Sequence, residues 1–200
     1  YRLFGDPFQY EVALFPPSTQ QPDLMLPFLA GKVWSYTGGP HPAWGNGFPW
    51  AAVDFAPPAA VGGCAVSNEW VTAMADGVVV RSGENTLVLD LDGDGNEATG
   101  WTIFYFHIAS NYMLPVGTVL AAGDPLGHPS CEGGRSTGTH VHVARKFNGE
   151  WIAADGMLPF VLSGWRVHAG NLPYQGRMTF ELPAMEIVAC ECVSTNTLSR

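Results

Sequence analysis

Two histidines separated by one residue stand in the β-type run Ser136–Val143, which reads STGTHVHV. In a strand, residues i and i+2 point to the same face. We therefore expect His140 and His142 side by side, with Val141 and Val143 turned to the other face. Two imidazoles on one rigid face suit a zinc site, where one binds the metal and the other works beside it. The alternative is a pair of polar residues on a solvated strand face.

A third histidine and a carboxylate lie upstream. Val53–Ala56 has the pattern of a short strand in which Asp54 faces away from Val53 and Phe55, and a Gly- and Pro-broken loop carries His41 back towards it. An imidazole, a carboxylate and an imidazole form a three-ligand set, and zinc in catalytic sites keeps its fourth position open for water. Taken singly, Asp54 could be a turn or cap residue and His41 an exposed loop histidine.

These residues together resemble the lysostaphin-type zinc endopeptidases, and the staphylolysin branch most closely. The resemblance covers roughly residues 33 to 155. The specific part is the His…Asp pair followed by the Gly-rich approach to His-x-His. It also includes Asp76–Val80, Tyr105–His107, the Val116–Thr118 turn and Cys131–Gly138.

The resemblance implies that His41, Asp54 and His142 bind zinc. It also implies that His107 and His140 stand beside the metal site as catalytic histidines. Spacing alone does not say which of His140 and His142 holds the metal. Nor does spacing single out His107, which otherwise reads as a histidine at the end of an aromatic β run.

The implied activity is hydrolysis of peptide bonds in peptidoglycan cross-links or glycine-rich peptides. A non-catalytic or regulatory domain of the same fold, binding peptidoglycan or another glycan, is the alternative. A calcium-stabilised extracellular binding module is a third hypothesis, but it leaves the histidines unexplained. Aromatic residues near the expected ligands could wall a slot for slim substrates or simply pack in the core: Trp44, Phe48, Trp50 and Tyr105.

The fold is expected to be mostly β. The resemblance implies a compact antiparallel sheet, sandwich-like or barrel-like, with a groove and flanking loops. From Val71 on, short apolar runs alternate with turn residues, which predicts antiparallel strands, and no segment has helical periodicity over more than about ten residues. The expected strands are Gly77–Arg81, Thr86–Leu91, Trp101–His107, Thr118–Ala121, His140–Lys146 and Trp151–Ala153.

The chain divides into three parts on this interpretation. Residues 1–30 are Pro-rich and are expected to form an extended arm on the domain. Residues 31–170 form the peptidase-like β domain, of which 31–60 is expected to be loop broken by one short strand. Residues 171–200 form a C-terminal hairpin and tail, with a hairpin between Arg177–Leu182 and Glu186–Cys190.

Net charge and cysteine content limit the partners and the cellular location that the sequence allows. The formal charge of −9 with only 9 Lys and Arg argues against nucleic acid and against simple attraction to an anionic cell wall. No apolar run of about 18 residues predicts a transmembrane helix. Four cysteines, Cys64, Cys131, Cys190 and Cys192, indicate two disulfides and a secreted, extracellular or periplasmic protein. Three connectivities exist. Because Cys190 and Cys192 are poorly placed to pair with each other, we expect each to bond to Cys64 or Cys131 and so to tie the C-terminal tail to the domain.

A second cation site is suggested by the loop Asp90–Glu97, where Asp90, Asp92 and Asp94 alternate with other residues and glycines supply the turn. Oxygen ligands of this kind suit a structural calcium ion. The alternative is a solvated hairpin tip, since Asp-Gly is a strong turn signal. His128 and His168 have no companion and are expected to be structural or exposed. Glu132 precedes the Gly-rich approach and is a candidate to touch the site.

Overall fold

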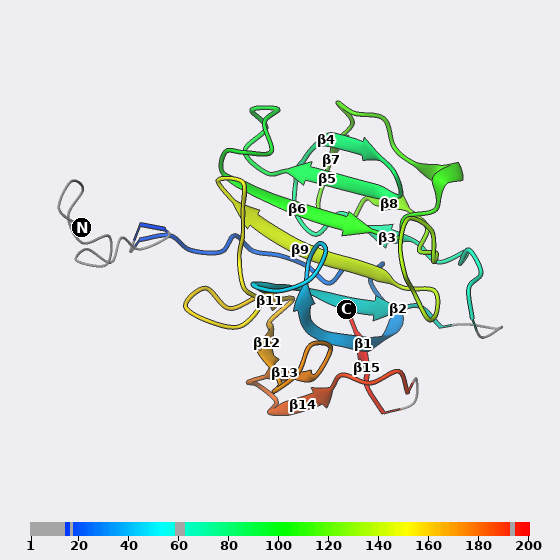
Figure 1. Cartoon of the computed structure of the whole chain (residues 1–200), viewed down its shortest axis with the longest axis vertical. Helices are drawn as coiled ribbons and strands as arrows, with labels where there is room; N and C mark the ends of the chain where they lie inside the picture. The colour runs from blue at the N-terminus through cyan, green and yellow to red at the C-terminus, as the bar shows by residue number, and fades with distance from the viewer. Residues whose placement is uncertain (1–14, 17, 59–62, 193–194) are drawn as a thin grey trace.

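A computed structural model describes residues 15–16, 18–58, 63–192 and 195–200. Its main element is a nine-stranded antiparallel sheet in the order β15-β1-β2-β9-β6-β5-β4-β7 (Figure 1). The ninth strand, β10, pairs with β9. Among the described residues, the two end strands, β15 and β7, do not pair with each other, so the sheet is open. The expectation of a mostly β, antiparallel fold is confirmed, and no barrel is closed. The strands are β1 (Val33–Pro42), β2 (Trp50–Ala56), β4 (Gly77–Gly83), β5 (Thr86–Asp90), β6 (Trp101–Phe106), β7 (Val119–Leu120), β9 (Val141–Phe147), β10 (Glu150–Trp151) and β15 (Thr197–Ser199).

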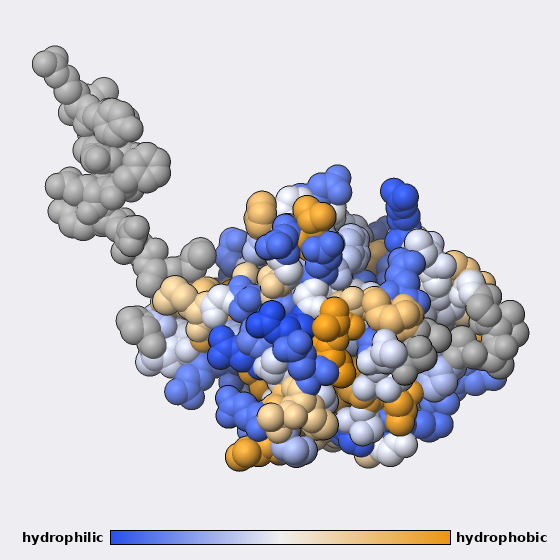
Figure 2. Space-filling model, turned by 90° about the horizontal axis from the view of Figure 1, so that it is seen from below, coloured by the Kyte–Doolittle hydropathy of each residue, from blue (hydrophilic) through white to orange (hydrophobic). Residues whose placement is uncertain are grey.

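Two smaller sheets flank the main one. A four-stranded sheet has the order β11-β12-β13-β14, and β3 pairs with β8. The expected C-terminal hairpin is present, because Arg177 of β13 pairs with Val188 of β14. Figure 2 views the molecule from the side on which this sheet lies and shows polar and apolar residues interspersed. The elements are β3 (Val71–Thr72), β8 (Pro125–Gly127), β11 (Val161–Leu162), β12 (Trp165–Ala169), β13 (Gly176–Phe180), β14 (Met185–Val188) and the 3-10 turn η1 (Ser110–Tyr112).

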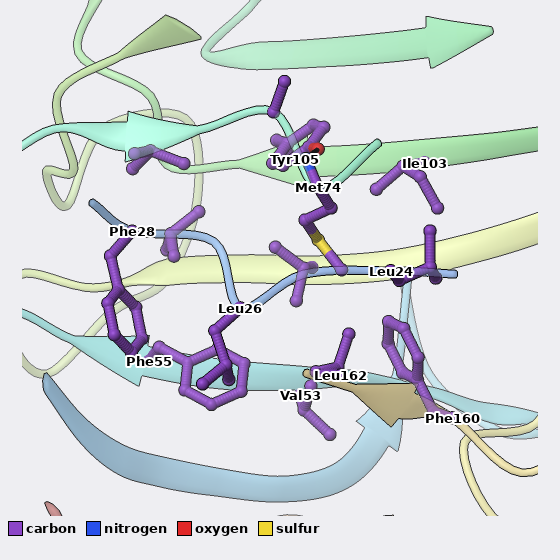
Figure 3. Close-up of a cluster of buried hydrophobic side chains, with 14 of the residues drawn as sticks. Leu24, Leu26, Phe28, Val53, Phe55, Met74, Ile103, Tyr105, Phe160 and Leu162 are labelled. Atoms are coloured by element: carbon purple, nitrogen blue, oxygen red, sulfur yellow. Dashed lines mark hydrogen bonds between the residues drawn. The ribbon is translucent and has the colours of Figure 1, made fainter. Parts of the chain in front are cut away.

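The main core lies on one face of the large sheet and is covered by the segment before β1. Leu24, Leu26 and Phe28 are buried against strand residues such as Val53 and Tyr105 (Figure 3). Their spacing of two residues is that of an extended chain, in which alternate side chains point the same way. Each such buried side chain contributes about 1.5–3 kcal/mol by leaving water. Of the residues 1–30 expected in the arm, 1–14 and 17 lie outside the described part of the chain.

The expectation of a loop with one short strand over residues 31–60 is wrong. β1 is 10 residues long and β2 is 7. The glycines and prolines of β1 coincide with three shifts of register against β2, and bulges are where a strand accepts such residues. Gly38 serves a close approach, because a Cβ there would lie 2.9 Å from Cγ of Asp54.

The expected disulfide pairing is also wrong. Cys64 bonds to Cys131, with Cα atoms 5.5 Å apart, and Cys190 bonds to Cys192, with Cα atoms 5.1 Å apart. No disulfide therefore ties the C-terminal tail to the domain. Backbone pairing holds it instead, since β15 forms a ladder with β1 at the edge of the large sheet. Among the described residues, no helix is long and apolar enough to cross a membrane.

Candidate metal centre

His41, Asp54 and His142 come from three adjacent strands of the large sheet, on the face opposite the main core. Asp54 of β2 is directly paired with His142 of β9, and side chains of a directly opposed pair lie on the same face. His41, near the end of β1, pairs with Ala52 of β2. The three side chains are 2%, 9% and 7% exposed. Rigid strands therefore hold all three donors in a buried position.

Three ligand atoms of these residues form a compact triangle. Nε2 of His41 lies 3.0 Å from Nδ1 of His142. That Nδ1 lies 3.1 Å from Oδ1 of Asp54, and the Asp54 oxygen lies 3.4 Å from Nε2 of His41. Tetrahedral zinc with bonds of about 2.0–2.1 Å separates neighbouring ligand atoms by about 3.3 Å. The triangle has the size that this geometry requires.

The second nitrogen of each ring fixes which nitrogen faces the triangle. Nδ1–H of His41 donates to the carbonyl of Gly39 over 2.8 Å, and Nε2–H of His142 donates to the carbonyl of Ala43 over 3.1 Å. In the neutral form of each ring, the nitrogen without a proton then faces the triangle. Three acceptors facing one point repel one another unless a cation stands between them. This donor set fits a zinc ion.

The charges of these groups are consistent with a cation site. Burial alone would raise the pKa of Asp54, but His41 and His140 reverse this and hold it well below its usual value. Burial opposes protonation of His41, yet the adjacent Asp54 outweighs it and raises the pKa of His41. At His142 burial prevails and lowers the pKa. The carboxylate is therefore ionised at neutral pH and supplies one negative charge to the site.

His107 and His140 lie beside this triangle with their rings 4.5 Å apart. Nε2 of His140 is 3.8 Å from Oδ1 of Asp54. Both rings donate Nδ1–H over 2.8 Å, His107 to the carbonyl of Glu132 and His140 to that of Gly138. Burial, followed by the nearby His140, lowers the pKa of His107 to about 4. Both rings therefore have Nδ1 engaged by a backbone carbonyl, which leaves Nε2 as the free ring nitrogen of each.

Two contributors to the site, Tyr174 and Gly38, have no recognisable signature in the sequence. Tyr174 stacks on His41 with ring centroids 4.1 Å apart, and its amide N–H donates to the carbonyl of Pro40. Gly38 leaves room for the Asp54 carboxylate. No local pattern around Tyr174 indicates a site, because only the packing of the loop before β13 against β1 brings it there.

The four aromatic residues considered for substrate contact lie in different places. Trp44 is 56% exposed and packs on Phe106, 5.3 Å between centroids, next to the carbonyl that holds His142. Phe48 is 85% exposed and stacks on Trp50. Tyr105 is fully buried in the main core, where its hydroxyl accepts the amide N–H of Met74. Tyr105 therefore lies on the face of the sheet opposite the metal triangle.

The remaining candidates lie apart from the triangle. Carboxylate oxygens of Asp90, Asp92 and Asp94 lie within 4.8 Å of one another at the end of β5. His128 packs on Trp70 and donates to the carbonyl of Glu69, and His168 contacts Thr179. Glu132 contacts His107 only through its backbone carbonyl.

Comparison with known proteins gives several matches. No protein-family model matches the chain. The chain is 30% identical over 162 residues to a beta-lytic metalloendopeptidase of Achromobacter lyticus, covering 76% of this chain and 39% of that protein. It is 25% identical over 197 residues to protease LasA of Pseudomonas aeruginosa, covering 86% of this chain and 43% of that protein. The chain thus spans less than half the length of either relative. Among solved structures, the deep-sea M23 metalloprotease pseudoalterin is 26% identical, with a TM-score of 0.69 over 90% of this chain and 99% of that one.

Proposed function

We propose that the chain is a zinc-dependent endopeptidase acting on peptidoglycan cross-links or glycine-rich peptides. Its similarity to beta-lytic metalloendopeptidase, protease LasA and the M23 metalloprotease pseudoalterin supports the proposal. The observation that carries the proposal is the triangle of His41 Nε2, Asp54 Oδ1 and His142 Nδ1, with sides of 3.0, 3.1 and 3.4 Å. All three donor atoms face one point and none carries a proton in the tautomers that the backbone carbonyls impose. We assign these residues as the metal ligands.

Zinc suits this donor set better than a hard cation, because two of the three donors are imidazole nitrogens. Bound there, it would supply Lewis acidity towards a peptide carbonyl and a water molecule. The second ring nitrogens of His41 and His142 are hydrogen-bonded to the carbonyls of Gly39 and Ala43, which holds the orientation of both rings. Outer partners of this kind fix the tautomer and the orientation of metal-binding histidines.

His107 and His140 are assigned to proton transfer. Each has its Nδ1–H committed to a backbone carbonyl, so each can accept a proton only at Nε2. An imidazole in this state takes a proton from the attacking water and returns it to the departing amine. While protonated, it also stabilises negative charge that develops on the carbonyl oxygen. Two such rings on one side of the ligand triangle suffice for both transfers.

The substrate class follows from the lysostaphin-type resemblance, with local support from exposed aromatic side chains. Trp44 packs on Phe106, whose ring contacts His107 and His142, and it is more than half exposed. Phe48 projects from the same β1–β2 connection. Exposed aromatic rings at the edge of the site would favour peptides with small side chains. Two disulfides are consistent with an extracellular or periplasmic location.

Metal analysis combined with hydrolysis assays tests the proposal. We expect about one zinc per purified chain and cleavage of oligoglycine or of purified cell wall, abolished by chelation and restored by zinc. A protein without bound metal that cleaves neither substrate would overturn it. The alternative of a non-catalytic binding domain predicts cell-wall binding without cleavage, and the convergence of all donor groups speaks against that alternative.

A further inference from the structure

The loop between β8 and β9 accepts hydrogen bonds from both histidines assigned to proton transfer. Its residues Glu132 and Gly138 supply the carbonyls that accept Nδ1–H of His107 and His140, each over 2.8 Å. The position of this loop therefore decides where both rings point and which nitrogen carries the proton. The loop contains no strand or helix, and it is held by backbone bridges of Pro129 and Ser130, by the Cys64–Cys131 disulfide and by side-chain contacts.

The carboxylate of Glu132 makes the contacts that anchor the loop beside His107. Its Oε2 accepts the side-chain amide of Asn85 over 2.8 Å and the backbone N–H of Ser110 over 3.0 Å. The same side-chain amide of Asn85 also contacts the segment after His107, because it donates to the carbonyl of Ile108 over 2.9 Å. The Ser110 and Asn85 contacts lower the pKa of Glu132, so the acceptor is a carboxylate at neutral pH. Hydrogen bonds to an ionised acceptor are about twice as strong as neutral ones.

His107 depends on this external support. Its φ of 64° lies in the left-handed region, which is uncommon for a residue other than glycine. Its carbonyl accepts both the N–H and the hydroxyl of Ser130, over 2.8 and 2.9 Å, and Ser130 Oγ also accepts the N–H of Glu132. The backbone and the ring of His107 are thus both attached to residues 130–132.

We propose that Glu132 is a positioning residue of the peptidase: its carboxylate, held by Asn85 and Ser110, places its own carbonyl so that His107 keeps Nδ1–H bound and Nε2 towards the metal site. This inference rests on the proposed function for its catalytic consequence. Glu132 itself touches no substrate. It acts through His107.

Steady-state kinetics of two variants provide the first test. We expect Glu132→Ala to lower kcat roughly tenfold to a hundredfold, the usual cost of a displaced catalytic group or lost outer partner, with KM within about twofold and zinc content unchanged. Glu132→Gln keeps an oxygen acceptor of the same reach and should recover most of the activity. Glu150→Ala removes an exposed carboxylate on β10 and serves as the matched control with wild-type kcat.

A polarity swap tests the contact itself and does not depend on the folding of Glu132→Ala. Asn85→Asp keeps the shape but sets a second carboxylate against Glu132, so kcat should fall similarly. Adding Glu132→Gln restores a donor–acceptor pair, and the double variant should be more active than Asn85→Asp alone. Equal or lower activity of the double variant would count against the contact.

Nitrogen-15 NMR of the histidine rings gives a readout that does not require hydrolysis. In the zinc-loaded wild type we expect the His107 ring to carry its proton on Nδ1, and in Glu132→Ala a mixture of tautomers. Wild-type kcat and an unchanged tautomer in Glu132→Ala would overturn the inference. If the wild type cleaves no substrate, the proposed function fails while the tautomer measurement still decides the role of Glu132.

Discussion

Gly38 of β1 and Asp54 of β2 are directly paired across the ladder, and the carboxylate of Asp54 occupies the space that a side chain at residue 38 would need. A Cβ at this position would lie 2.9 Å from Cγ of Asp54. The site thus depends on a missing side chain on the neighbouring strand as well as on the ligands themselves.

Gly38→Ala should therefore weaken zinc binding by displacing Asp54. We expect zinc affinity to fall roughly tenfold to a hundredfold, measured by competition with a chromogenic chelator. Gly77→Ala is the matched control, because its Cβ would lie 2.8 Å from Cγ of Leu89, away from the site. It should lower the melting temperature without changing zinc affinity. Equal zinc affinity in Gly38→Ala and wild type would show that Asp54 does not need this space.

Ligand and proton-transfer histidines should separate in metal analysis. His142→Ala and His41→Ala each remove a corner of the triangle and should lose both zinc and activity. His140→Ala should keep most of the zinc while kcat falls roughly 10²- to 10⁴-fold, the usual share of general acid–base catalysis. Full zinc content in His142→Ala contradicts the assignment.

The buried His107 predicts a pH dependence of stability in the metal-free protein. Burial lowers its folded pKa to about 4, against about 6.5 in an unfolded chain. Between these values the unfolded state binds the proton and the folded state does not, so the free energy of unfolding falls as pH drops from 6.5 towards 4. Above pH 6.5 the ring is neutral in both states and stability does not depend on it. At pH 5 the free energy of unfolding is lower by on the order of 2 kcal/mol.

The comparison of wild type with His107→Asn isolates this contribution from those of the other histidines. Denaturant unfolding of both proteins without metal at pH 7 and pH 5 measures it. We expect the variant to lose less stability than the wild type over this interval. Equal losses would place His107 in a solvated environment.

The two disulfides should differ in their effect on activity. Cys131 directly precedes Glu132 and is bonded to Cys64. The neighbours of Cys64, Gly63 and Ala65, are hydrogen-bonded to Thr139, which directly precedes His140. Replacing both Cys64 and Cys131 by Ser should lower kcat with zinc retained and cost up to about 4 kcal/mol of stability, because a long loop is opened. The same change at Cys190 and Cys192, which close a span of two residues, should leave kcat unchanged and cost about 1 kcal/mol. Equal effects of the two double variants on kcat would argue against a role for the first disulfide in placing the loop.

A calcium ion at Asp90, Asp92 and Asp94 has its own test. If calcium binds there, it raises the melting temperature of the zinc-loaded protein, and a calcium-selective chelator lowers it. Asp92→Asn should reduce the calcium effect, and Asp124→Asn, which alters a turn elsewhere, should not. An unchanged midpoint in all conditions rules the ion out.

The sequence by itself determined the strand pattern and the chemical types at the site. Alternation predicted His142 of β9 and His140, directly before β9, on one face, and Asp54 away from its apolar neighbours on β2, because strand geometry is local. It could not place the disulfides or β1. The spacing of Cys190 and Cys192 disfavours the bond that they form. The glycines of β1 predict a loop, because a local pattern does not show which neighbour fills the space that they leave.

Only the tertiary structure decided which atoms meet. The orientation of His41 and His142 depends on the carbonyls of Gly39 and Ala43, the hold on His107 depends on Glu132, and the buried position of Tyr105 depends on its strand register. Each of these contacts joins groups whose relative position is set by sheet pairing or loop packing. A residue's type and spacing carry its chemistry, whereas distance and direction between residues far apart in the chain arise only once the strands have paired.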